Sequence, residues 1–516
     1  MPPISRITSP MKIVIVETPR PLTIEHYNDV ANAPLSASLN GGYALAVARR
    51  AGWDTGHLDF TASNPDAAAI AATILAEDAD IVLLHWVYSW GHEELVRSIL
   101  ELLRRESAAK LGAFGLFPSL SPSRLLQFAP QLDFILAGEF EGTLAELLPV
   151  FAERRTVAAL PGVVLRSGKF VPRPLIADLS LFPIPDDVGA NVGYTTLNIA
   201  ASRGCYGECS FCFIHRYYGC SRRRTRDLAS LKRELETRLL RRGIDSLYFI
   251  DPTFIGQGEG ERERVREIGR MVRSFGLPFG FETRVDCIDG ELMAALAGLG
   301  ATSVFLGIES GCDSVLQRIG KRISTGQIRR GVQAVRDSGI KLHLGFIMFE
   351  PDSSLAELEE NYDFLEEMGL LDDHELTADL LYHNQIVLHG SAAWERFGGE
   401  GRLLLDERLP FEARYRFCDE RVGHVCAAMG RLTSGYFSTM AGIRQSRSAA
   451  GAHCGAENRN DDFVDGAVNN LLKDAFRSFC RAAQMLQPEA VVDVEREYAG
   501  RLSATFCCYP PVPCGN

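Results

Sequence analysis

The sequence predicts an α/β protein built from two successive parallel sheets and a helical C-terminal region. Strand and helix patterns alternate in two separate series, a proline-rich passage divides the two series, and 516 residues are too many for one ordinary core. The predicted parts are a doubly wound, Rossmann-like domain at 1–160, a linker at 161–190, a partial barrel at 191–390 and a mainly helical region at 391–516.

The first series begins with KIVIVE at 12–17, a β-branched run typical of a buried strand. Residues 35–53 follow with helical spacing and end near Gly52. Strands and helices then alternate as far as residue 148, which predicts a parallel sheet with helices on both faces. Ligands bind such sheets beyond the carboxyl ends of the strands. The candidate loops are therefore 18–20, 85–90, 115–121 and 138–142.

The second series follows the linker, whose segment at 174–189 is rich in proline and lacks periodicity. Its first strand is predicted at 194–202, four more follow, and a sixth is less clear in ADLLYHNQIVL at 378–388. Six alternations predict a partial (β/α)6 barrel, in which chemistry gathers at the carboxyl ends of the strands. Those ends are predicted at 202–212, 251, 282–284, 309–310, 348–350 and 383–385.

Composition and charge limit the expected partners. The chain is 46% hydrophobic and 23% charged, which is typical of a soluble globular protein. Its net charge of −12 repels phosphate backbones, so no nucleic acid is expected to bind. No leader and no bilayer-length apolar run is recognised, so we expect no membrane association and a cytoplasmic location. The thirteen cysteines are dispersed, which favours reduced thiols over a disulfide framework.

Three of these cysteines, Cys205, Cys209 and Cys212, form a C-x3-C-x2-C motif just past the first barrel strand. Three thiolates on a four-iron cluster leave one iron without a protein ligand, and that iron can take a substrate or cosubstrate. The alternatives are a structural zinc site, completed by His215 or Cys220, and incidental core cysteines. The spacing and the position of the motif favour the iron–sulfur interpretation.

The segment RGCYGECSFC resembles the signature loop of radical S-adenosylmethionine (SAM) enzymes, which bind a [4Fe–4S] cluster through three cysteines. The resemblance runs from 190 to 390 through YFIDPTF, GIES and GFIMFEPDSS. It points to the branch with an N-terminal cobalamin-binding domain, which includes radical methylases of natural-product pathways and the anaerobic magnesium-protoporphyrin cyclase. LAGEFEGTLAELL at 136–148 is similar to the last strand and helix of that domain.

The resemblance implies a role for individual residues. Cys205, Cys209 and Cys212 match the cluster ligands, and Asp251 matches the position that contacts the methionine amino group, where a carboxylate suits an ammonium. The other implied SAM contacts are Glu309 with Ser310 at the ribose, Lys321 or Arg322 at the methionine carboxylate, and the backbone of Ile347 and Met348 at the adenine. Taken alone, Asp251 or Glu309 would more often be a strand-end carboxylate or a helix cap.

Cobalamin is expected in the first domain, although the D-x-H-x-x-G motif, whose histidine ligates cobalt from below, is absent. Many members of this branch lack that histidine. A corrin needs apolar cover and hydrogen-bonding groups, and the strand-end loops supply candidates in Trp86, Gly115, Ser119 and Gly138. The alternatives are a degenerate domain that has lost its cofactor, or a core in which Trp86 and Trp90 merely pack.

The function implied by the resemblance is reductive cleavage of SAM to a 5'-deoxyadenosyl radical, followed by methylation of an unactivated carbon of a small-molecule natural product with the help of cobalamin. The expected partners are that substrate and an external electron donor of the flavodoxin or ferredoxin type. One alternative is an enzyme of the same build that rearranges, cyclises or oxidises its substrate. Another is a non-catalytic iron–sulfur or zinc protein.

Overall fold

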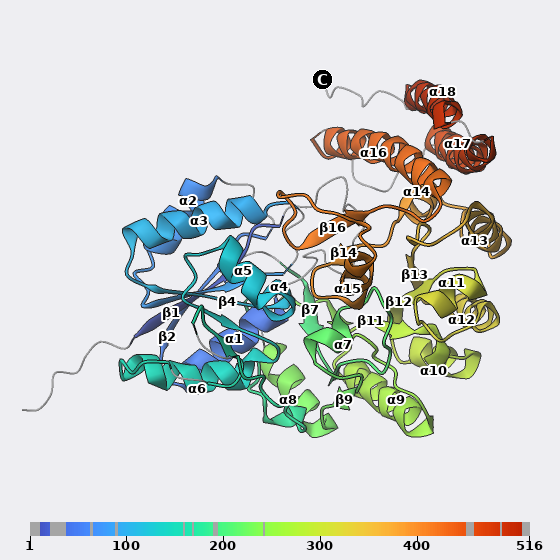
Figure 1. Ribbon diagram of the computed structural model, residues 1–516. Helices are drawn as coiled ribbons and strands as arrows, with labels where there is room; N and C mark the ends of the chain where they lie inside the picture. The colour runs from blue at the N-terminus through green and yellow to red at the C-terminus, as the bar shows by residue number, and fades with distance from the viewer. Residues whose placement is uncertain are drawn as a thin grey trace, which may run out of the picture.

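The computed structural model describes residues 11–20, 38–61, 66–87, 91–157, 160–167, 170–188, 194–240, 243–449, 459–485 and 488–507. These residues form two parallel sheets with their covering helices, and long C-terminal helices that pack against the second sheet's domain (Figure 1). Trp90 lies outside the described residues. Among the described residues, no helix is both long and apolar enough to cross a lipid bilayer.

The N-terminal sheet is doubly wound, as predicted. Its strands are β1 (Lys12–Glu17), β2 (Asp54–Asp59), β3 (Ile81–His85), β4 (Lys110–Phe114), β5 (Phe134–Leu136) and β6 (Val163–Val164), in the order β2-β1-β3-β4-β5-β6. All pairings are parallel except that of β6 with β5. One face is covered by α1 (Leu39–Arg50) and α6 (Phe140–Ala152), the other by α2 (Ala67–Leu75), α3 (Glu93–Glu106), α4 (Leu116–Leu120) and α5 (Pro122–Phe128) (Figure 1).

Strand β1 is apolar on both faces, which is why it lies inside this sheet. Ile13 and Ile15 pack in the core beneath α1 and α6, whereas Val14 and Val16 pack in the core on the opposite face. The strand that follows β1 in sequence pairs on one side of it, and β3 pairs on the other. The gap between the carboxyl ends of β1 and β3 is therefore the topological switch point, where ligands bind in such sheets.

The second sheet is a five-stranded parallel arc. Its strands are β7 (Thr196–Ile199), β10 (Ser246–Phe249), β11 (Phe279–Arg284), β12 (Ala301–Glu309) and β13 (Lys341–Phe346), in the order β13-β12-β11-β10-β7. The helices between and after these strands are α8 (Leu228–Arg238), α9 (Glu259–Ser274), α10 (Gly290–Gly298), α11 (Asp313–Arg318), α12 (Thr325–Ser338) and α13 (Leu355–Glu367). Their apolar faces share one core with the sheet.

The segment at 378–388, predicted as a sixth strand, is not a continuous strand. Helix α14 (His374–Tyr382) takes up its first half, and only Asn384 continues the arc, through a single parallel bridge to Phe349. The run of apolar residues fits either structure locally. The capping carboxylate of Asp373, which accepts from the Leu376 N–H, favours the helix.

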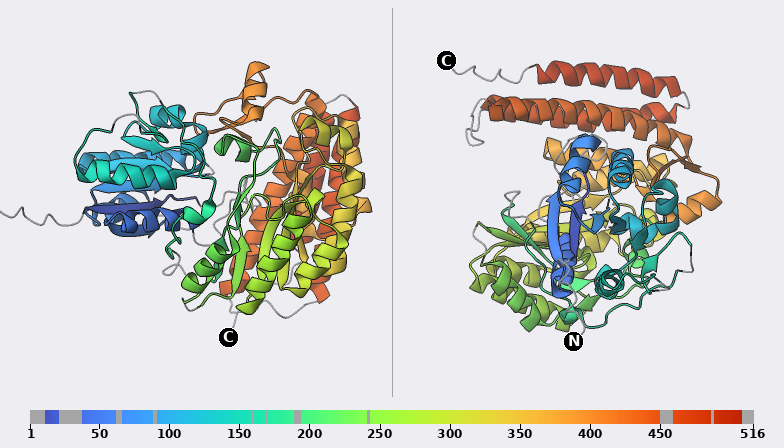
Figure 2. Two further views of the ribbon diagram at one scale, coloured as in Figure 1. Left: turned by 90° about the horizontal axis from the view of Figure 1, so that it is seen from below. Right: turned by 90° about the vertical axis from the view of Figure 1, so that its left-hand side faces the viewer.

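The C-terminal region is mainly helical, as predicted, but it begins with a small sheet that the sequence did not reveal. Strands β14 (Val387–Leu388), β15 (Leu403–Leu404) and β16 (Glu412–Tyr415) pair antiparallel around α15 (Ala392–Gly399). The long helices α16 (Glu420–Ala449), α17 (Arg459–Gln484) and α18 (Pro488–Phe506) follow. They lie side by side along the barrel domain and share its core (Figure 2).

Candidate active site

The cysteine motif lies in a loop that begins directly after the first barrel strand. β8 (Ser202–Arg203) pairs with β9 (Arg224–Thr225), so the loop leaves and returns at the same place. Gly204 has a φ of 84°, and a side chain there would collide with the carbonyl oxygen of Arg222. The base of the hairpin therefore holds the thiols near the carboxyl ends of the barrel strands.

The three thiols lie close enough together to affect one another's protonation. Burial, together with the neighbouring Cys209 and Cys205, raises the pKa of Cys212 to about 12. Burial also raises the pKa of Cys205, whose sulfur accepts a hydrogen bond of 3.3 Å from the Gly207 N–H. Thiolates at these positions need a bound cation to neutralise them, and the thiolate is the form that binds metal.

The described residues do not support the zinc alternative. A tetrahedral zinc site with Zn–S distances of about 2.3 Å brings its thiolates to about 3.8 Å of one another. Among the residues that the structure describes, no three His, Cys, Asp or Glu side chains gather around one such position. A four-iron core is larger and takes three thiols that lie farther apart.

Asp251 follows β10 and is fully buried. Its carboxylate accepts from the Ala201 N–H at 3.0 Å and from the Ser202 hydroxyl, so it joins the second strand of the arc to the start of the cysteine loop. Burial raises its pKa to about 6. Contact between Asp251 and the amino group of SAM stays a prediction, and the hydrogen bonds show that this residue also positions the loop.

Glu309, Ser310, Lys321 and Ile347 come together after β12 and β13. The Lys321 Nζ lies 2.7 Å from Glu309 Oε1, and Glu309 has a φ of 65°, which is rare outside glycine. Its carbonyl accepts from the Ile347 N–H at 2.7 Å. The Ser310 hydroxyl donates to Asn361 at 2.7 Å. The proposed ribose and carboxylate contacts are thus adjacent and stay predictions.

Of the two cations considered for the methionine carboxylate, only Lys321 is buried. Burial opposes its charge, but Glu309 outweighs this effect and raises the pKa of Lys321. The Arg322 side chain is 74% exposed and lies 3.4 Å from Glu208. The geometry therefore favours Lys321 as the cation that would face the cosubstrate.

Arg284, at the end of β11, contacts the cysteine loop directly. Its Nη1 donates to the sulfur of Cys209 at 3.8 Å, and its guanidinium lies over the ring of Tyr206 at 5.0 Å. The same side chain is held by Asp286 at 3.0 Å and by the carbonyl of Lys321 at 2.7 Å. Sequence position alone placed Arg284 at a strand end but did not reveal this contact with a predicted cluster ligand.

The inner face of the arc carries a set of side chains of which the sequence analysis identified only Glu282, at a strand end. Alternate residues of the strands are fully buried beneath the outer helices, whereas Asn198, Tyr248, Glu282, Phe305 and His343 are only partly buried. Cross-strand pairing aligns Glu282 with Phe305 and Phe305 with His343. The period of two along each strand could have identified these lumen-facing positions.

Gly115, Ser119 and Gly138 meet at the carboxyl edge of the first sheet. The Ser119 hydroxyl donates to the Gly115 carbonyl at 2.5 Å and accepts from the Gly138 N–H at 2.9 Å. The carbonyl of Gly138 accepts from the Tyr217 hydroxyl at 2.9 Å. Tyr217 belongs to α7 (Ile214–Tyr217), which begins two residues after Cys212. The edge of the first sheet and the cysteine loop are therefore in contact.

Trp86 has the surroundings of a core residue. It is fully buried, and its ring meets those of Phe128 and Phe411 edge-on, with centroids 6.4 and 6.2 Å away. This position agrees with the alternative in which Trp86 packs. A direct contact of Trp86 with a cofactor stays a prediction.

The segment from β14 to β16 contacts both the loops of the first sheet and helix α7, which follows the cysteine motif. The ring of Phe411 stacks on Phe117 with centroids 4.6 Å apart, and the Ser121 hydroxyl lies 2.6 Å from His389 Nδ1. Arg216 of α7 pairs with Glu395 of α15 at 2.7 Å. The loops of the first sheet, the cysteine loop and the C-terminal segment therefore surround the barrel mouth together.

Comparison with known families assigns the class. The chain matches the B12 binding domain over residues 38–148 and the radical SAM superfamily over residues 199–365. It therefore belongs to the B12-binding radical SAM enzymes, as the resemblance of its sequence implied. The first match covers β2 to β5 of the doubly wound sheet, and the second begins at the last residue of β7.

Particular relatives differ in their chemistry. The uncharacterized methyltransferase PH0819 of Pyrococcus horikoshii is 25% identical over 70% of this chain and 79% of its own length. The 4'-phospho-dehydrooxetanocin synthase of Priestia megaterium is 27% identical over 61% of this chain and 46% of its own. The hopanoid C-3 methylase of Methylococcus capsulatus is 31% identical over 43% of each. The chain thus spans less than half the length of two of these relatives.

A solved structure supports the fold over almost the whole chain. The cobalamin-dependent SAM radical enzyme OxsB, with aqua-cobalamin and SAM bound, aligns with a TM-score of 0.78 over 96% of this chain and 80% of its own, at 16% identity. The order of a cobalamin-type sheet, a partial barrel and C-terminal helices is therefore shared.

The cofactors of the family are a [4Fe–4S] cluster, SAM and cobalamin, and the residues present fit them. At the cobalamin edge, the buried atoms Glu17 Oε1, Arg20 Nε and His57 Nε2 have no hydrogen-bond partner among the residues that the structure describes. When bound, the cluster, SAM and cobalamin supply hydrogen-atom removal from an unactivated carbon and, in methylases, the methyl group. The residues predicted to hold SAM are Lys321 at its carboxylate and Glu309 at its ribose, and both contacts stay predictions.

Proposed function

We propose that this chain is a cobalamin-dependent radical SAM C-methyltransferase that methylates an unactivated carbon of a small-molecule natural product. The observation that carries the proposal is the contact between the cysteine loop and the edge of the cobalamin-binding sheet. Tyr217 donates to the Gly138 carbonyl, and Phe213, next to Cys212, packs against the core of the first domain. Radical formation and methyl supply would thus take place at one opening.

The relatives support methylation more than any other outcome. PH0819 and the hopanoid C-3 methylase are both described as methylating enzymes, although the first has no known substrate and the second matches less than half of this chain. We infer that the substrate enters between the first sheet and the barrel mouth. Hydrogen-atom removal needs no general base, so the lumen side chains Tyr248, Glu282 and His343 would orient the substrate rather than deprotonate it.

An external donor would deliver the electron that starts the reaction. A flavodoxin or ferredoxin is the expected class of donor, because the described chain carries only one cysteine motif of cluster-binding spacing. The experiment below replaces this donor with dithionite or titanium(III) citrate, so that its outcome does not depend on the donor.

A second candidate is a rearrangement or ring contraction without methyl transfer. Its support is the match to 4'-phospho-dehydrooxetanocin synthase, which covers 61% of this chain. The two candidates share the cluster, SAM and cobalamin, so the products of SAM distinguish them.

The test uses the full chain, reconstituted anaerobically with iron, sulfide and hydroxocobalamin, then reduced and given SAM with a trideuterated methyl group. The first candidate predicts both 5'-deoxyadenosine and S-adenosylhomocysteine, with the deuterated methyl recovered on the corrin. 5'-Deoxyadenosine without S-adenosylhomocysteine would overturn methyl transfer in favour of the second candidate. A variant with Cys205, Cys209 and Cys212 all changed to Ala controls for 5'-deoxyadenosine formed without the cluster.

A further inference from the structure

A buried polar cluster at the carboxyl edge of the first sheet has no role in the cysteine site. Its centre is Glu17, the last residue of β1, and His85, the last residue of β3. The two residues are paired across the strands, with side chains that are 0% and 5% exposed. They stand on either side of the topological switch point, which is where ligands bind in a sheet of this order.

The His85 ring is fixed in one orientation. Its Nδ1 lies 2.7 Å from Glu17 Oε2, and the ring stacks on Phe114 with centroids 4.8 Å apart. The backbone of His85 is held as well, because the Thr18 hydroxyl donates to its carbonyl at 3.1 Å. The Glu17 carboxylate can accept the proton on Nδ1 of a neutral His85 imidazole.

In the neutral tautomer with its proton on Nδ1 toward Glu17, the lone pair of His85 is on Nε2. The neighbour of Nε2 is the Asn40 side-chain amide, whose Nδ2 lies 3.4 Å away, at the long end of the hydrogen-bond range. Imidazoles that ligate metals almost always donate their other ring N–H to a carboxylate or carbonyl. The Glu17 and His85 pair has this form, and a metal ion at Nε2 would replace the long contact with Asn40.

We propose that His85 Nε2 is an axial ligand of the cobalt when cobalamin is bound, with Glu17 as the carboxylate that orients the imidazole. His85, at the end of β3, would ligate cobalt in place of the missing histidine of the D-x-H-x-x-G motif. His57 belongs to the same cluster, with its Nε2 4.0 Å from Glu17 Oε1, and the variants below distinguish the two histidines. The proposal rests on cobalamin binding and not on methyl transfer.

Electron paramagnetic resonance of the full chain loaded with cob(II)alamin tests this ligand directly. A nitrogen ligand splits each cobalt line into three, and the prediction is that the splitting becomes two lines when the protein's histidines carry ¹⁵N. The base of cobalamin itself would give three lines with or without labelled histidine. A spectrum that is insensitive to the label overturns the proposal.

Two variants identify the histidine. His85→Gln should abolish the label-sensitive splitting, whereas His57→Gln, in the same cluster, should keep it. Label-sensitive splitting that persists in His85→Gln would overturn the assignment. Circular dichroism shows whether His85→Gln folds. If it does not, the labelled wild type and His57→Gln still test the assignment. Loss of the splitting in His57→Gln would assign the ligand to His57 and overturn the proposal. A failure of methyl transfer would leave these spectra unchanged.

Discussion

Burial opposes the charge of ionisable side chains at the barrel mouth, but the net effect on the pKa differs from residue to residue. Glu282 faces the lumen, and burial and the nearby Asp251 raise its pKa to about 7. Burial opposes the charge of Arg284 too, but Asp286, Tyr206 and Cys209 outweigh that effect and raise its pKa. Glu282 is therefore sensitive to pH in the neutral range, and Arg284 stays a cation beside Cys209, a predicted cluster ligand.

Glu282→Gln should change the pH dependence of stability. Glu282 keeps its proton to about pH 7 in the folded state, whereas a glutamate of the unfolded chain titrates at about pH 4.3. The folded state therefore binds more protons between these two pH values. Wild-type stability falls as the pH rises through the window from about 4.3 to about 7. Glutamine removes this loss. The melting temperature of Glu282→Gln, relative to wild type, should therefore increase between pH 5 and pH 8.

An exposed glutamate serves as the control. Glu407→Gln removes a carboxylate that lies at the surface and should give a difference in melting temperature that does not vary over the same range. If the difference for Glu282→Gln were equally flat, the raised pKa would be wrong.

Arg284→Gln should make the cluster harder to reduce. The guanidinium donates to the Cys209 sulfur and brings a positive charge next to the cluster, and both effects favour the more negative, reduced form. The midpoint potential of the reconstituted cluster, titrated by paramagnetic resonance, should fall in this variant. Arg329→Gln, which removes an arginine from the outer helix α12, should leave the potential unchanged. An unaltered potential in Arg284→Gln would contradict a direct contact.

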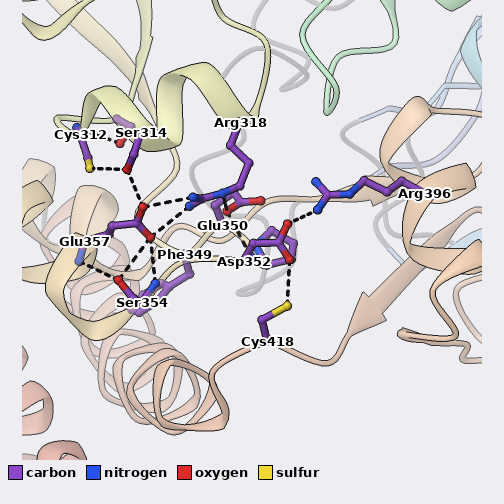
Figure 3. A network of polar contacts seen from close by, with 12 residues as sticks. Cys312, Ser314, Arg318, Phe349, Glu350, Asp352, Ser354, Glu357, Arg396 and Cys418 are labelled. Atoms are coloured by element: carbon purple, nitrogen blue, oxygen red, sulfur yellow. Dashed lines mark hydrogen bonds and ion pairs between the residues drawn. The ribbon is translucent and has the colours of Figure 1, made fainter.

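At the scale of elements, a polar network behind the barrel mouth fastens the C-terminal segment to the strand ends (Figure 3). Asp352 follows β13 and accepts from Arg396 and Arg402, and Cys418 donates to it at 3.2 Å. Burial works against ionisation of Asp352, but Arg402 outweighs it, so the pKa of Asp352 is lowered. On the other side, Arg318 bridges Glu350 at 2.8 Å and Glu357 at 3.1 Å. The network joins α11, α13 and α15.

Asp352→Asn should loosen the segment from β14 to β16. The substitution removes a charge whose side chain is only 10% exposed and leaves Arg396 and Arg402 with Glu400 as their remaining carboxylate, at a cost of about 2–4 kcal/mol. Amide hydrogen exchange in residues 386–415 should become about 30-fold faster or more, because about 2 kcal/mol corresponds to that factor. Asp363→Asn, at a site with 73% exposure, is the matched control and should change exchange little. Unchanged exchange in Asp352→Asn would mean that the network does not hold the segment.

At the scale of the whole molecule, local patterns predicted the two sheets, because each central strand is an apolar run long enough to be recognised by itself. KIVIVE is β1, as its pattern indicates. The pattern of ADLLYHNQIVL suits both a helix and a strand, and in the structure the segment is a helix followed by a single bridge. The two-residue strands β14 and β15 could not be predicted, since they depend on pairing with β16.

The same distinction applies to the site. The cysteine motif is local and was predicted from spacing alone. The contacts of Arg284 with Cys209, of Tyr217 with Gly138 and of Glu17 with His85 join residues 75, 79 and 68 positions apart. Such contacts depend on how the strands and domains are arranged, which no short pattern in one sequence records.

The central claim is that the cluster and cobalamin meet at one opening, where the cysteine loop contacts the edge of the first sheet. The most direct test is paramagnetic resonance of the full chain that holds both a reduced [4Fe–4S] cluster and cob(II)alamin. Two spins at one opening should relax each other, so the cob(II)alamin signal should saturate at higher microwave power than in the variant with Cys205, Cys209 and Cys212 changed to Ala. Identical saturation in the two proteins would contradict the account.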